Sequence, residues 1–222
     1  LLVYAKTDPA AGAKGISAFI VDRDSPGFSV AQKLTKMGFR GSPTAELVFD
    51  GCRVPADNLL HVENEGVAVV MSGLDLERAL IAPICVGMAE RALELCVDYA
   101  RERKQFGRPI GQFQMIQAKL ADMYAALESM RYLACATVAR CNDLEKGGGG
   151  RGEIHRLTAA SALHAATSCM RILDEAVQIH GGYGYMWETE INRLDRAGKL
   201  LEIGAGTNEV RRMIIAEELL RA

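Results

Sequence analysis

The chain has 222 residues, of which 49% are hydrophobic and 24% charged, so it can bury a sizeable core in one or two domains. Its net charge of −2 and pI of about 6.1 give no basic surface of the kind that binds nucleic acid. No apolar run is long enough to cross a membrane, so neither nucleic acid nor a membrane is expected as a partner.

The six cysteines are scattered and include no CxxC pair. This spacing favours packed, reduced thiols over disulfides or zinc ligands, and predicts a reducing compartment: the cytoplasm of a bacterium or the mitochondrial matrix of a eukaryote. The four histidines show no ligand spacing, so no metal site is expected. The sequence starts in the middle of a strand-like run, Leu1 to Ala5, without an initiator Met, and we expect an N-terminal portion to be missing.

The first 60 residues are predicted to be β-structure. Short apolar or alternating runs separated by glycine and proline predict strands at residues 1–5, 16–21, 28–30 and 47–49. The pattern becomes helical after residue 60. We therefore predict two domains, residues 1–60 and residues 61–222.

The second domain is predicted to consist of long helices. Apolar periodicity and glycine or proline breaks predict helices over residues 66–103, 113–141, 153–179, 188–201 and 207–222. Pro83 lies inside the first helix and is expected to kink it. Long helices joined by short breaks favour an antiparallel up-down bundle of the four-helix type, so the fold class is α+β.

One glutamate interrupts the apolar stripe of the first predicted helix. The stripe has steps of three and four and includes Val67, Val70, Leu74, Ile81, Ile84, Met88, Ala92 and Leu95. Glu77 falls on the same face, without a cationic residue three or four positions away. A carboxylate held against apolar surface gains affinity for a proton and can act as a base near neutral pH. Alternatively, Glu77 lies at the edge of the stripe and reaches solvent.

Three motifs stand at predicted helix ends. The segment Gly204–Thr207 precedes the last helix and can bring backbone amides to an anionic ligand. The segments Arg103–Gly107 and Gln178–Gly182 end the first and third helices. Each motif also has an ordinary explanation, namely a threonine N-cap, cations at a helix C-terminus, and a double-glycine C-cap. Taken alone, Gln114 is an ordinary polar surface residue.

Together these motifs resemble the acyl-CoA dehydrogenase family in order and spacing. The matching segments are Met37–Ser42, Leu74–Arg78, Arg103–Gly107, Gln178–Gly184 and Ile203–Arg212. The resemblance covers the whole chain. It implies that residues 1–60 are the later part of the family's middle β-domain and that the remainder is its C-terminal helical bundle.

The resemblance also implies the position of the catalytic base. Most members of the family carry a glutamate just before the Gly-Thr of the last motif, where this chain has Ala205. A minority, including isovaleryl-CoA dehydrogenases, carry the base within Leu-x-x-Glu-Arg on the first bundle helix. Residues Leu74–Arg78 match that pattern. The chain is therefore most similar to this minority, with Glu77 as the implied base.

The implied reaction is the α,β-dehydrogenation of a short, branched acyl-CoA to the trans-2-enoyl-CoA. Glu77 would remove the α-proton while the β-hydrogen leaves as hydride to FAD, and the Ala205 amide would donate to the thioester carbonyl. The implied acyl-CoA contacts are Ser42, Pro43, Ala68, Asp75, Leu76, Arg78, Ala205 and Gly206. Pro43 and Ala68 depart from the residues common in the family, so the shape of the acyl pocket is expected to differ.

The family binds FAD between two subunits. The residues implied to contact a neighbour's FAD are Arg103, Gln114, Gln178, Ile179, His180, Gly181 and Gly182. Thr207, Asn208 and Glu209 are implied to contact the subunit's own FAD. The resemblance further implies a homotetramer built as a dimer of dimers, and an electron-transferring flavoprotein as electron acceptor. Two alternatives stay open: an acyl-CoA oxidase or other flavin oxidase of the same fold, and a non-catalytic helical scaffold.

Overall fold

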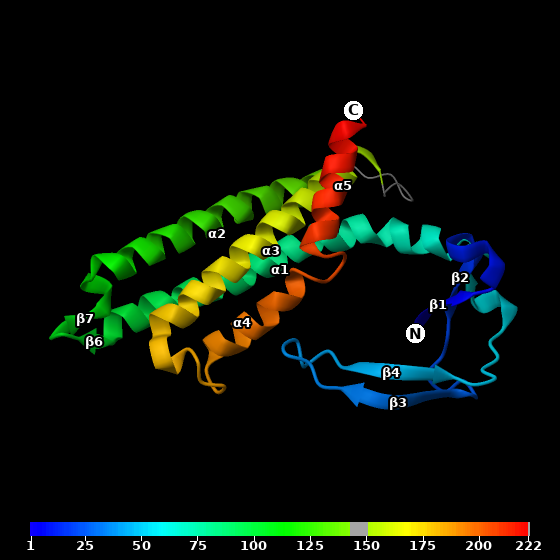
Figure 1. Ribbon diagram of the computed structural model, residues 1–222, viewed down its shortest axis with the longest axis horizontal. Helices are drawn as coiled ribbons and strands as arrows, with labels where there is room; N and C mark the ends of the chain where they lie inside the picture. The colour runs from blue at the N-terminus through cyan, green and yellow to red at the C-terminus, as the bar shows by residue number, and fades with distance from the viewer. Residues whose placement is uncertain (143–150, 222) are drawn as a thin grey trace. The chain divides into compact units, whose positions relative to one another are not determined.

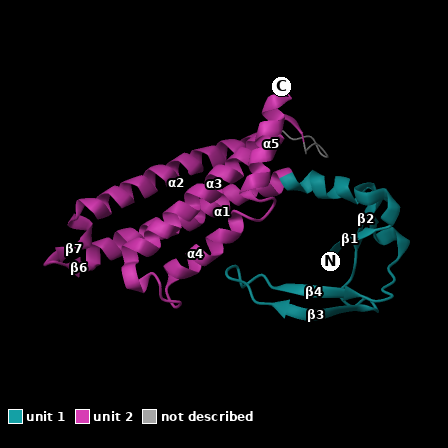
Figure 2. Cartoon of the chain, in the orientation of Figure 1, with its two compact units in different colours: residues 1–74 teal, residues 75–222 magenta. Residues whose placement is uncertain are grey.

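The computed structural model describes residues 1–142 and 151–221, and its contacts divide the chain into two compact units, residues 1–74 and 75–222 (Figure 2). The division falls inside the first long helix, 14 residues after the predicted boundary at residue 60. The start of that helix belongs to unit 1 because Gly66 lies against the preceding sheet. A Cβ added at Gly66 would come within 2.7 Å of the Ser17 carbonyl carbon.

Unit 1 contains two small antiparallel sheets. The first has the order β1-β2-β5, and the second is the hairpin of β3 and β4, with a bulge between Val30 and Gln32. The strands are β1 (Leu2–Lys6), β2 (Ile16–Ile20), β3 (Phe28–Leu34), β4 (Thr44–Phe49) and β5 (Leu59–Leu60). The four predicted strands are present. The hairpin strands extend beyond the predicted ranges because cross-strand pairing, and not local apolarity alone, sets their length.

The helices of the chain end close to the predicted positions. They are α1 (Gly66–Glu102), α2 (Gln114–Cys141), α3 (Gly152–His180), α4 (Glu190–Leu201) and α5 (Asn208–Leu220). Thr189 and Thr207 cap α4 and α5 with side-chain oxygens that accept from backbone amides. Helix α1 continues through Pro83. A short hairpin of β6 (Lys104–Gln105) and β7 (Arg108–Pro109), which the sequence did not predict, follows α1.

Helix α3 is the centre of unit 2 and packs against α2, α4 and α5 (Figure 1). Ion pairs join Lys119 to Glu175, and Arg140 to Glu153 at 3.0 Å, so α2 and α3 run antiparallel. The observed fold therefore agrees with the predicted order of a β-region followed by a helical bundle. Near its end, α4 approaches α3 closely at Gly198, where a Cβ would come within 2.5 Å of a Leu173 methyl carbon.

The apolar stripe predicted for α1 is displaced from the face that the structure buries. The buried apolar residues of α1 are Ala79, Ile81, Ala82, Cys85, Val86, Ala89, Ala92, Cys96 and Ala100. Ile84 is 45% exposed, and Glu77 is exposed as well. The prediction that Glu77 points into the core was therefore wrong. Small alanine and cysteine side chains let the helices approach closely, and a count of large apolar residues overlooks such a face.

Candidate functional site

Three residues within one turn of α1 combine an exposed carboxylate with buried charges. Glu77 is exposed, whereas Asp75 is 1% and Arg78 3% exposed. Successive helical residues point about 100° apart, so one turn can present Glu77 outward while Asp75 and Arg78 enter the bundle. Of the two alternatives for Glu77, the exposed position is the one that this structure adopts. Leu76 beside it is 53% exposed.

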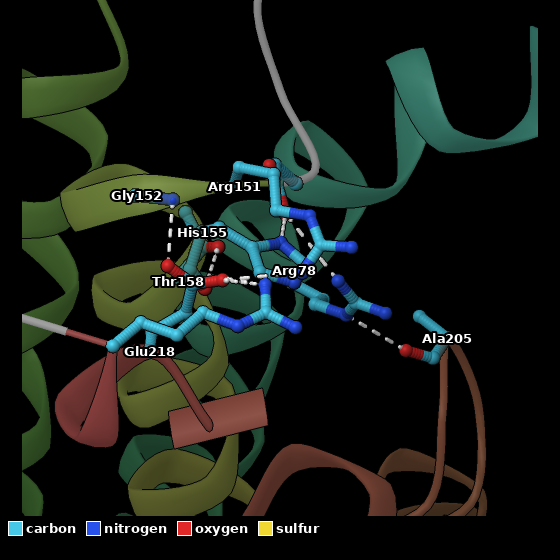
Figure 3. Close-up of polar contacts among 9 residues, drawn as sticks. Arg78, Arg151, Gly152, His155, Thr158, Ala205 and Glu218 are labelled. Atoms are coloured by element: carbon cyan, nitrogen blue, oxygen red, sulfur yellow. Dashed lines mark hydrogen bonds and ion pairs between the residues drawn. The ribbon is translucent and has the colours of Figure 1, made fainter. Parts of the chain in front are cut away.

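The buried charges of this turn meet a histidine from α3. The Asp75 Oδ1 atom lies 2.6 Å from His155 Nδ1 and accepts from Arg78 Nη1 at 3.3 Å. The exposed side-chain fractions are 2% for Asp75, 4% for Arg78 and 7% for His155. A buried charge whose partner is removed destabilises a fold strongly, so these groups fix one another in place. Figure 3 shows how His155 and Arg78 lie together.

Arg78 connects this turn to the loop before α5. Its Nε donates to the Ala205 carbonyl oxygen at 3.1 Å (Figure 3). Ala205 has φ 52° and Gly206 φ 92°, so both adopt the left-handed region. A residue with a side chain persists there only where its surroundings hold it, and the Arg78 contact is part of that support. The structure thus brings together the implied substrate residues Asp75, Arg78, Ala205 and Gly206.

A second buried arginine holds the same loop from α5. Arg211 is 0% exposed, and its Nη2 donates to the Gly204 carbonyl oxygen at 2.7 Å. Its Nη1 donates to Asn208 Oδ1 at 2.9 Å and to the Ala162 carbonyl oxygen at 3.4 Å. Burial lowers the pKa of the Arg211 guanidinium.

Neither Arg211 nor His155 was among the predicted site residues. The sequence carried a signal for each. Arg211 falls three positions before Ile214 on the inward side of α5, while its neighbour Arg212 is exposed. His155 stands three positions before Thr158, which is also buried on α3. A buried face predicted from helical spacing would have marked both as polar groups that need partners.

The residues implied to contact the subunit's own FAD surround the start of α5. The Thr207 hydroxyl oxygen accepts from the Val210 amide at 3.4 Å, and the Asn208 side-chain amide donates to Glu202 Oε1 at 3.1 Å. Glu209 is exposed, and hydrogen bonds from its own backbone amide and from the Thr207 hydroxyl lower its pKa. These residues adjoin the loop that Arg78 and Arg211 hold.

Most residues implied to contact a neighbour's FAD lie around one pocket at the far end of α1 and α3. This pocket has a volume of about 360 Å³ and is lined in part by Tyr99, Arg103, Ile179, His180, Gly181 and Gly182. The His180 ring stacks on Tyr99 with centroids 4.5 Å apart, and its Nδ1–H donates to the Ala176 carbonyl oxygen at 2.8 Å. The implied contacts Gln114 and Gln178 are exposed and do not line it.

The remaining implied substrate residues belong to unit 1. Ser42, Pro43 and Ala68 are all exposed. The Ser42 carbonyl oxygen accepts from Lys36 Nζ at 2.5 Å, which closes the loop between β3 and β4. Within residues 1–142 and 151–221, no cluster of histidine, cysteine, aspartate or glutamate is arranged to bind a metal ion. In the same residues, none of the helices has the length and apolarity needed to cross a membrane.

Comparison with known proteins gives matches along the chain. The profile described as acyl-CoA dehydrogenase, C-terminal domain, matches residues 64–220, and the one described as acyl-CoA dehydrogenase, middle domain, matches residues 1–52. A mitochondrial isovaleryl-CoA dehydrogenase of Oryza sativa subsp. japonica is 50% identical over 222 residues, which are 100% of this chain and 52% of that protein. A mitochondrial 2-methylacyl-CoA dehydrogenase of Solanum tuberosum is 48% identical with the same coverage.

A solved structure agrees with these matches. The three-dimensional structure of butyryl-CoA dehydrogenase from Megasphaera elsdenii superposes with a TM-score of 0.90 at 40% identity, covering 99% of this chain and 56% of that one. The chain therefore spans about half the length of the relatives it matches.

Proposed function

Since the chain belongs to the acyl-CoA dehydrogenase family, we propose that its protein is an FAD-dependent enzyme that oxidises a short, branched acyl-CoA to the trans-2-enoyl-CoA. Isovaleryl-CoA is the first candidate substrate. The similarity to isovaleryl- and 2-methylacyl-CoA dehydrogenases, at 50% and 48% identity, supports a branched acyl chain.

The contact between Arg78 and Ala205 is the observation that carries the proposal. Most members of the family carry the base at the position of Ala205, and a minority carry it at the position of Glu77. In this chain the residue after Glu77 donates to the Ala205 carbonyl at 3.1 Å, so Arg78 links the turn of α1 that carries Glu77 to the loop that carries Ala205. This link supports the proposal that a base on α1 acts on the same α-carbon as a base in the loop.

In the proposed reaction Glu77 removes the α-proton of the thioester. This proton is too weakly acidic for a carboxylate unless the developing enolate is stabilised, which calls for hydrogen bonds to the thioester oxygen. The Ala205 N–H is the donor that this chain supplies. The small side chain of Ala205 leaves room near the α- and β-carbons, where a branch would lie.

Some of the other implied substrate residues are proposed to contact the acyl-CoA, and two are proposed to hold the site in position. We retain Leu76, Gly206, Ser42, Pro43 and Ala68 as proposed contacts of the acyl-CoA. The charged groups of Asp75 and Arg78 are engaged inside unit 2. We therefore assign these two side chains the task of fixing the Glu77 turn and the Ala205 loop, in place of direct contact with the acyl-CoA.

The residues around the pocket at the far end of α1 and α3 fit a dinucleotide. Arg103 offers a fixed positive charge that suits a pyrophosphate, and the stacked rings of Tyr99 and His180 offer a flat apolar wall. A Cβ built at Gly181 or Gly182 meets no atom within 4 Å, so a ligand can approach the backbone there. Bound FAD supplies the acceptor for the β-hydride.

We assign the implied FAD contacts to two sets. Arg103, Gln114 and residues 178–182 would bind the FAD of a neighbouring subunit, and Thr207, Asn208 and Glu209 the subunit's own. This sharing requires an oligomer, proposed as a homotetramer, with an electron-transferring flavoprotein as partner. The six cysteines are free thiols, which fits a reducing compartment, the mitochondrial matrix or the bacterial cytoplasm.

An anaerobic flavin-reduction panel tests this function. The full-length protein is mixed with isovaleryl-, isobutyryl-, butyryl- or octanoyl-CoA, and the rate of flavin bleaching gives a specificity constant for each. We expect the branched substrates to lead. A clear preference for octanoyl-CoA would refute the branched pocket, and no bleaching with any acyl-CoA would favour the scaffold. Rapid oxygen consumption would instead identify an oxidase.

A further inference from the structure

Two buried arginines hold successive carbonyls of the loop before α5. Arg78 from α1 donates to the Ala205 oxygen at 3.1 Å, and Arg211 from α5 donates to the Gly204 oxygen at 2.7 Å. The shorter bond belongs to a side chain that is 0% exposed. A charge-assisted bond of this kind is stronger than a neutral one, so the Gly204 oxygen is firmly fixed.

The Gly204 oxygen and the Ala205 N–H belong to a single peptide group. The described chain contains no cis peptide bond, so these two groups point in opposite directions within one plane. Holding the oxygen therefore sets the direction of the N–H. A cation at the oxygen also polarises the amide, which makes its N–H a better donor.

The Ala205 N–H lacks the hydrogen bond that neighbouring amides of this segment make. Among the described residues it donates to no protein acceptor, whereas the Gly204 amide donates to Leu200 and the Asn208 amide to Glu202. The φ of Ala205, 52°, is a strained conformation for a residue with a side chain. Strain of this kind requires support from the surroundings, and Arg211 supplies part of it.

We infer that Arg211 is a positioning residue of the reaction. It orients and polarises the Gly204–Ala205 peptide so that the Ala205 N–H stabilises the negative charge that develops on the thioester oxygen. The inference rests on the proposed function. It assigns to Arg211 an effect on the enolate in addition to the support that its contacts with Asn208 and Ala162 give to α5.

The test measures the enolate directly. Acetoacetyl-CoA ionises at its α-carbon, and the absorbance of its enolate can be titrated with pH while it is bound to the full-length holoenzyme. Arg211→Gln keeps a donor but loses the charge, and Arg211→Lys keeps the charge but loses the forked geometry. Arg171→Gln removes a 72% exposed arginine of α3 and serves as the control.

We expect wild-type protein and Arg171→Gln to lower the apparent pKa of the bound ligand to the same value. Arg211→Gln should raise this pKa by about one unit, a tenfold weaker stabilisation, and Arg211→Lys by a smaller but measurable amount. The affinity of each variant for coenzyme A alone should stay unchanged. Flavin reduction by isovaleryl-CoA should slow by about the same tenfold factor, short of the roughly 10²–10³ that loss of an oxyanion donor costs.

An enolate pKa equal to that of wild type in whichever Arg211 variants fold would overturn the inference. Because Arg211→Lys retains the charge, it carries the test alone if Arg211→Gln does not fold. Wild-type protein that binds acetoacetyl-CoA without lowering its pKa would contradict the proposed function itself. That result differs from a failure of the Arg211 inference, in which wild type and variants lower the pKa equally.

Discussion

Neighbouring residues of one helical turn have opposite environments in this chain. Glu77 is exposed, whereas Asp75 and Arg78 are buried and bonded to each other, with His155 beside the carboxylate. The motif Leu-x-x-Glu-Arg alone does not predict which of these side chains is exposed and which is buried, because it gives no information about the residues that they contact. Their separation depends on contacts with residues more than 75 positions away, as for Asp75 with His155.

The buried cluster of Asp75, Arg78 and His155 is expected to contribute to the stability of the fold. Asp75→Asn removes the negative charge and leaves the Arg78 guanidinium buried without its ionic partner. We expect the free energy of unfolding to fall by about 3–5 kcal/mol, measured by denaturant titration. The control is Asp98→Asn, which breaks an ion pair whose side chains are 71% and 75% exposed and should change stability by less than about 1 kcal/mol. Equal losses in the two variants would show that the cluster is not a stabilising unit.

The proposal that bases at positions 77 and 205 act on the same α-carbon predicts partial rescue. Glu77→Gly should abolish flavin reduction by acyl-CoA, and adding Ala205→Glu should restore part of it. Ala205 occupies the left-handed region, so the new glutamate begins from a strained backbone and full activity is not expected. Stopped-flow flavin reduction compares the single and double variants. If the single and double variants both retain FAD and are equally inactive, the two base positions do not act on the same α-carbon.

At the scale of elements, helix ends were easier to predict from the sequence than helix faces. Caps and breakers such as Thr207 and Gly181 act locally, and each helix begins and ends close to its predicted position. The buried face of α1 was displaced because alanine and cysteine form it, and small side chains give a weak apolar signal. The hairpin of β6 and β7 escaped prediction because strands of two residues show no period.

Close packing of α4 on α3 predicts opposite effects for two helical glycines. Gly87→Ala on α1 meets no atom within 4 Å, so it should raise the free energy of unfolding by about 0.5–1 kcal/mol through helix propensity. Gly198→Ala would place its Cβ 2.5 Å from Leu173 Cδ1 and 2.8 Å from Met170 Sδ. It should lower stability by roughly 1–3 kcal/mol through overpacking. A higher free energy of unfolding in both variants, measured by thermal or denaturant unfolding, would show that α3 can shift to accommodate the added methyl group.

At the scale of the molecule, the family and the order of the two regions were predictable because several motifs recur at fixed spacing. The matches to residues 1–52 and 64–220 confirm the family. The substrate contacts in unit 1 and the subunit arrangement remain proposals. The chain spans about half the length of the relatives it matches, and the structure holds one copy of it without ligands.

If FAD is shared across subunits, replacing a residue that contacts a neighbour's FAD should lower the FAD content of the oligomer. Arg103→Ala removes the cation of the pocket at the far end of α1 and α3 and should lower the FAD content of purified protein, measured from the ratio of flavin to protein absorbance. Arg101→Ala, which removes a 75% exposed arginine outside that pocket, is the matched control. Light scattering should show a tetramer for the wild type. A monomer with full flavin content would refute the shared site.

The role of Glu77 as the base can be tested by comparing the wild type with a single variant. Wild type and Glu77→Gln, each loaded with FAD, are mixed anaerobically with isovaleryl-CoA and followed by stopped-flow absorbance. Glutamine keeps the size of the side chain but cannot accept the α-proton as a base. We expect Glu77→Gln to bind FAD and acyl-CoA normally while flavin reduction slows by a factor of about 10² or more. Reduction at a near wild-type rate in this variant would contradict the claim.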